Sequence, residues 1–171
     1  MLFRSHIGIF TPLIPYANAR SLRLILLNQR DYRNSSPLTE PEIQALHSGD
    51  KTLQCGYVTQ RVLELGEFLK WFVEHEKIPK ISESDVGKVG GISVLAWSSG
   101  GCLGAPFLGL AESIPPPTRA ILDEYIRSLI LYGMYPVGHS RGQTLTRTSI
   151  QILPTTLLGI LSSHQMNAGH P

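Results

Sequence analysis

Cysteine is scarce in this chain, and its charge is not concentrated anywhere. Among 171 residues there are only two cysteines, Cys55 and Cys102, and neither has the spacing of a zinc site. The formal net charge is +2 at pH 7, and the basic residues form no run that could follow a phosphate backbone. We therefore expect no disulfide framework, no metal site and no nucleic-acid partner.

Long apolar runs are also missing. The most apolar late stretch, residues 150–161, contains Gln151 and Pro154 and is far shorter than the roughly 20 residues that cross a bilayer. Residues 1–6 lack the basic and apolar segments of a secretion signal. With 42% hydrophobic and 16% charged residues, the composition is typical of a globular domain. These features predict a soluble, cytoplasmic protein without a membrane span.

Three short apolar runs predict buried strands, at residues 22–28, 92–96 and 127–132. Helical patterns separate them. A capping-box sequence predicts a short helix through Leu46, and apolar residues at three- and four-residue steps predict a long helix at 51–76. A small-residue helix that follows residues 97–104 and runs to about Ser113 is also expected, and another at 118–125, on either side of three prolines.

This alternation of strands and helices predicts the fold class. Strands joined by long crossovers favour an α/β fold with a parallel sheet and helices on both of its faces. We expect this core to occupy residues 1–136. Residues 137–171 show no clear period, so an irregular, poorly ordered tail is expected there.

The segment that carries chemistry follows the second apolar run. Ala96-Trp97-Ser98-Ser99-Gly100 matches a small-x-Ser-x-small pattern, typical of a strained strand-to-helix turn that exposes a nucleophilic serine. Small residues are needed on both sides because larger ones would collide across the turn. Ser98 is therefore the candidate catalytic nucleophile, and the backbone N–H of Ser99 is the candidate oxyanion-hole donor. Alternatively, Ser98 only caps the following helix.

At this turn and in three other segments the chain resembles the fungal α/β-hydrolases of esterase or epoxide-hydrolase-like type. The segments are residues 8–17, 28–32 with 35–37, 90–100 and 125–132. The resemblance implies an α/β-hydrolase-type sheet and serine-dependent hydrolysis of an ester or a related small substrate. It also implies a triad of serine, an acid and histidine, with no metal or organic cofactor.

Departures from the family pattern predict impaired catalysis. Family members carry extra strands and a His-Gly oxyanion loop ahead of the first matching segment, and they continue Asp-Pro-Pro where this chain has Gly133. We therefore expect a sheet that is truncated at both ends. His139, His164 and His170 are available as a base, but each is expected to be a solvated tail residue. Weak or absent turnover follows from this.

Two other hypotheses stay open. A catalytically inactive hydrolase-fold fragment could act as a binding or interaction module and self-associate through exposed sheet edges. Ser99-x-Gly101-x-x-Gly104 also imitates a dinucleotide-binding turn whose first glycine is replaced. The acidic residues that should end the next strand, Asp123 and Glu124, fall in a helical stretch, which argues against a nucleotide site.

Overall fold

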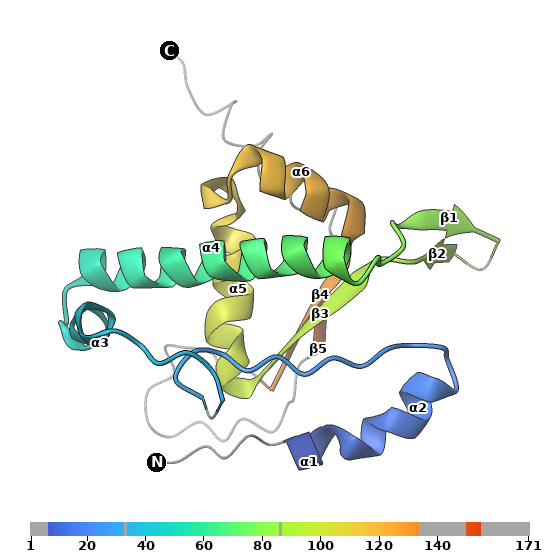
Figure 1. Ribbon diagram of the computed structural model, residues 1–171, viewed down its shortest axis with the longest axis horizontal. Coiled ribbons are helices and arrows are strands. Elements are labelled where there is room, and N and C mark those ends of the chain that lie inside the picture. Colours follow the sequence, from blue (N-terminus) through green and yellow to red (C-terminus); the bar gives the residue numbers. More distant parts are fainter. Residues whose placement is uncertain (1–6, 33, 86, 134–149, 155–171) are drawn as a thin grey trace. The chain divides into compact units, whose positions relative to one another are not determined.

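The computed structural model describes residues 7–32, 34–85, 87–133 and 150–154 (Figure 1). The chain divides into two units, Met1–Gln54 and Cys55–Pro171. In the described ranges no helix is long and apolar enough to cross a membrane.

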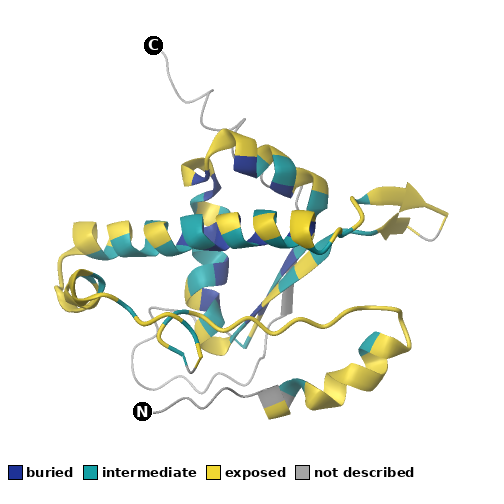
Figure 2. Ribbon diagram, in the orientation of Figure 1, coloured by how far each residue is buried: buried dark blue, intermediate teal, exposed yellow. Residues whose placement is uncertain are grey.

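The first unit is helical, and none of its residues that the structure describes is buried (Figure 2). Its elements are α1 (Ile7–Phe10), the 3-10 turn η1 (Thr11–Leu13), α2 (Ile14–Asn18) and α3 (Glu40–His47). Helix α3 begins in a capping box, in which the Thr39 backbone N–H donates to Glu42 Oε2 at 2.6 Å. The predicted short helix is thus confirmed, whereas α1 and α2 were not predicted.

The strand predicted at residues 22–28 is wrong. This segment has no regular secondary structure, and its leucine and isoleucine side chains are 40% to 58% exposed. The physical reason is that a strand needs a partner to accept its backbone hydrogen bonds, and the described part of the first unit contains no other strand. The apolar side chains predicted a buried strand here. A buried strand also needs a partner strand, and the sequence of the segment itself does not specify one.

The second unit holds the sheets and the helices that cover one of them. Helix α4 (Lys51–His75) leads into this unit and matches the predicted long helix. The remaining elements are β1 (Ser82–Ser84), β2 (Gly87–Val89), β3 (Ile92–Trp97), η2 (Ser98–Gly100), α5 (Gly101–Gly109), η3 (Ala111–Ser113), α6 (Pro116–Tyr125), β4 (Ile126–Tyr132) and β5 (Ile150–Pro154). Strands β1 and β2 form an exposed antiparallel hairpin that the sequence analysis did not predict.

The main sheet has the strand order β3-β4-β5 (Figure 1). Strands β3 and β4 are parallel, with Val94 opposite Leu129 and Ala96 opposite Leu131, as predicted for these two runs. Strand β5 pairs antiparallel with β4. The sheet is therefore mixed, so the prediction of a purely parallel sheet is wrong, and β5 lies inside the region predicted as an irregular tail. Its short run gave no period from which a strand could be predicted.

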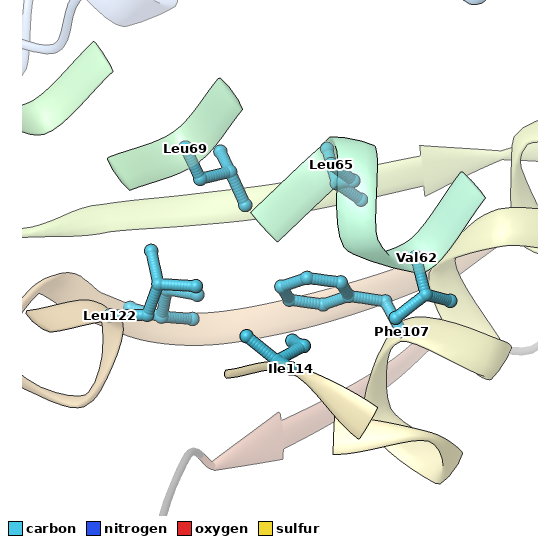
Figure 3. Packing of buried hydrophobic residues seen from close by; sticks show 7 residues of the cluster. Val62, Leu65, Leu69, Phe107, Ile114 and Leu122 are labelled. Carbon is cyan, nitrogen blue, oxygen red and sulfur yellow. The ribbon is translucent and has the colours of Figure 1, made fainter. Parts of the chain in front are cut away.

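Helices α4, α5 and α6 pack on one face of this sheet. Figure 3 shows side chains from all three helices converging in one cluster, which includes Val62, Leu65, Leu69, Phe107, Ile114 and Leu122. Val94 packs against this cluster and also against a second one, formed by Ala96, Leu129 and Leu131. Ser93 and Leu95 alternate with these residues along β3 and are exposed. The described helices of this unit therefore cover one face, which fixes the turn after β3 against a packed core.

Candidate functional site

The turn at Ser98 connects the extended end of β3 directly to a helix. Trp97 has extended backbone angles, φ −104° and ψ 133°, and η2 and α5 follow it without a loop. Ser98 itself has a φ of +52°. A serine in the left-handed region is uncommon and costs on the order of 1 kcal/mol or more. The strand-to-helix turn expected from the sequence is therefore present, and it is strained at the residue proposed to carry the chemistry.

The residue Ser98 is exposed to solvent. Both Ser98 and Ser99 are exposed, and Ser98 makes no side-chain hydrogen bond to any other described residue. The backbone N–H of Gly101 closes the turn by donating to the carbonyl oxygens of Ser98 and Ser99. Ser99 lies at the start of the helical segment, where backbone N–H groups have no helical partner and favour negative charge. The alternative role of Ser98, a side-chain cap, finds no hydrogen bond among the described residues.

Close packing of α5 on β3 holds this turn in place. A Cβ atom at Gly104 would lie 2.4 Å from Ala96 Cβ and 3.1 Å from Leu131 Cδ2. Ala96 is the small residue two positions before Ser98, so its methyl group and the bare backbone of Gly104 define the separation of strand and helix. Any larger side chain at either position would force α5 away from the sheet. The small residues around Ser98 thus have a direct packing role.

Gly133 lies beside the same turn, at the end of β4. Its φ is +67°, and a Cβ atom there would lie 3.5 Å from Trp97 Nε1 and 4.0 Å from the Ser98 backbone nitrogen. This is the position at which the family resemblance implies the acid, and glycine supplies no carboxylate. The missing acid is visible in the sequence, whereas the proximity of Gly133 to the turn was not predicted. A glycine directly after a strand is a signal for positive φ that points to such a tight approach.

The described histidines have surroundings of their own. The three tail histidines considered as a base, His139, His164 and His170, lie outside the described residues. Of the histidines that are described, His75 stacks on Trp71 with ring centroids 4.7 Å apart, and His47 ends α3 in the first unit. The described part of the chain contains no group of three or more potential metal ligands.

The acidic residues of α6 have other surroundings. Desolvation by burial raises the pKa of Asp123 above its ordinary value, and Arg119 opposes part of this shift. Glu124 forms an ion pair of 2.5 Å with Lys80, and its hydrogen bond and charge raise the pKa of that lysine. Both acids lie in α6, as the helical pattern predicted, and not at the end of a strand, where a dinucleotide-binding unit would need one.

Searches against family models, curated proteins and solved structures find nothing that matches this chain.

Proposed function

We propose that this chain is an α/β-hydrolase-related protein in which Ser98 accepts the acyl group of an ester or a related small substrate. The observation that carries the proposal is the backbone of Ser98, with a φ of +52° between a strand and a helix. Strain of this kind persists only where the surrounding structure enforces it, and it is concentrated at functional sites. Here the turn is flanked by close packing of helix on strand, since a Cβ atom at Gly104 would lie 2.4 Å from Ala96 Cβ.

The chemistry follows from the position of the turn. The Ser98 oxygen forms a bond to the acyl carbon, the ester C–O bond breaks, and the alcohol leaves with the proton from serine. Negative charge that develops on the carbonyl oxygen is stabilised by the Ser99 backbone N–H and by the start of the helical segment. Water then releases the acid and restores the hydroxyl group. No cofactor takes part in this scheme.

Slow turnover is part of the proposal. Serine is a weak nucleophile unless a base removes its proton and an acid orients that base. Gly133 supplies no acid beside the turn. Enzymes that lose triad members keep only about 10³–10⁴-fold catalysis over water, through the oxyanion hole and substrate binding. We therefore expect both acylation of Ser98 and release of the acyl group to be slow, with the acylated protein still detectable.

A chromogenic acetate ester tests the proposal. The folded protein is expected to release alcohol slowly but faster than the ester hydrolyses in buffer alone, with the acyl group found on the protein by mass spectrometry. Ser98→Ala should abolish both signals. Ser99→Ala is the matched control, because it removes a neighbouring hydroxyl but keeps the backbone N–H that the oxyanion needs. Ester cleavage that is unchanged in Ser98→Ala would overturn the proposal.

A further inference from the structure

Segment 22–28 is mostly apolar and has no regular secondary structure. Within the described chain it pairs with no strand, and no hydrogen bond involves the backbone of residues 24–27. Its exposed apolar side chains are Leu22, Leu24, Ile25, Leu26 and Leu27. A contiguous exposed apolar segment of this kind is typical of an interaction site.

The second unit carries a matching acceptor. Strand β3 pairs with β4 on one side only, and no described strand lies along its other side. An open strand edge presents N–H and C=O groups that can pair with an added strand. The two faces of β3 differ: Val94 and Ala96 face the core, whereas exposed Ser93 and Leu95, the latter 48% exposed, lie on the opposite face.

Donor and acceptor agree in length and in pattern. Seven extended residues span roughly 23 Å at about 3.3 Å each, and the six residues of β3 span roughly 20 Å. Leu24 and Leu26 alternate with Ile25 and Leu27 along the segment, so both faces of the added strand are apolar. One face would then continue the row of Val94 and Ala96, and the other would lie beside Leu95.

We propose that segment 22–28 of one chain adds as a strand to the open edge of β3 in a second copy, and that two copies exchange these segments reciprocally. Reciprocal exchange makes a closed dimer, whereas one-way donation would make open filaments. Five apolar side chains per copy, each about half exposed, remove on the order of 500 Å² when buried in the dimer. Two donors and a similar area from the two acceptor edges give a total on the order of 2,000 Å², above the roughly 1,000 Å² that a specific interface needs.

Light scattering coupled to size-exclusion chromatography tests the dimer. The expected mass is twice the 18.9 kDa of one chain. Ile25→Pro blocks strand formation by the donor, and Leu95→Lys places a charge beside the acceptor edge. Each change is expected to raise the dissociation constant of the dimer by at least about tenfold, equivalent to the loss of roughly 1.4 kcal/mol. Both residues are exposed, so circular dichroism should show an unchanged fold.

Leu53→Lys is the matched control, because Leu53 is 51% exposed on α4, outside both the donor and the acceptor. This variant is expected to remain dimeric. Three results would overturn the proposal: a wild-type chain that stays monomeric at every concentration, equal weakening by Leu53→Lys, or growth into filaments without a limiting size. None of these measurements depends on the chemistry at Ser98, so the dimer and the proposed function can fail separately.

Discussion

A methyl group at position 104 has no room between α5 and β3. The added Cβ would lie 2.4 Å from Ala96 Cβ, and the alanine methyl cannot rotate away because it is fixed to the strand. Overpacking of this kind costs about 1–3 kcal/mol, while replacing glycine by alanine in a helix returns about 1 kcal/mol. For so close an overlap we expect Gly104→Ala to lower the free energy of unfolding by about 1–2 kcal/mol net. In a chain of this length that lowers Tm by roughly 2–8 °C.

Urea unfolding followed by circular dichroism measures this loss. Gly109→Ala is the matched control, since it lies in the same helix and nothing lies within 4 Å of its added Cβ. That variant should be as stable as the wild type or up to about 1 kcal/mol more stable. Ala96→Gly removes the other methyl group, so the double variant should be more stable than the sum of the single effects predicts. Gly104→Ala with wild-type stability would refute the packing argument.

The remaining predictions concern strain, the core and pH. Ser98→Gly should raise the free energy of unfolding by about 1 kcal/mol, because glycine adopts positive φ without strain. Ser99→Gly should lower the free energy of unfolding, because Ser99 has no positive φ to relieve. The midpoints of urea unfolding check both variants. Phe107→Ala should cost about 3–5 kcal/mol in the same assay, since its ring is 5% exposed in the central cluster. The folded protein raises the pKa of Asp123, so the folded state holds this proton more tightly and ionisation opposes folding. Asp123→Asn should therefore raise the urea midpoint at pH 7. This gain in stability should vanish as the pH falls through the raised pKa to below the ordinary pKa of aspartate. A gain that grows on acidification would contradict a raised pKa in the folded state.

Local signals predicted helix α3 of the first unit and most of the second unit. The capping box at Thr39 and the three- and four-residue steps of α4 specify helices through neighbouring residues alone. The prolines before α6 stop the preceding helix and then form the first turn of the next one, where a missing N–H costs no hydrogen bond. Strands β3 and β4 were predicted because each lies between clear turn or helix boundaries.

Pairing between distant segments could not be predicted in the same way. Segment 22–28 and β5 are both short apolar runs, yet the structure pairs only β5 with another strand. The local sequence does not specify which strand edge a segment pairs with, because that edge exists only in the assembled sheet. For the site, the five-residue pattern predicted the strained turn at Ser98. The pattern could not predict an acid or a base, because a catalytic triad takes these residues from segments that are distant in the sequence. Their roles, and the catalytic role of Ser98 and Ser99, stay predictions.

The attachment site of a fluorophosphonate tests the central claim most directly. The folded protein is exposed briefly to the reagent, digested, and mapped by mass spectrometry, and a sample unfolded in urea is treated in parallel. A single adduct on Ser98 in the folded sample, absent from the unfolded one, is the predicted result. Modification of Ser99 or of another serine instead, or equal modification of Ser98 in both samples, would contradict a nucleophile made reactive by the turn.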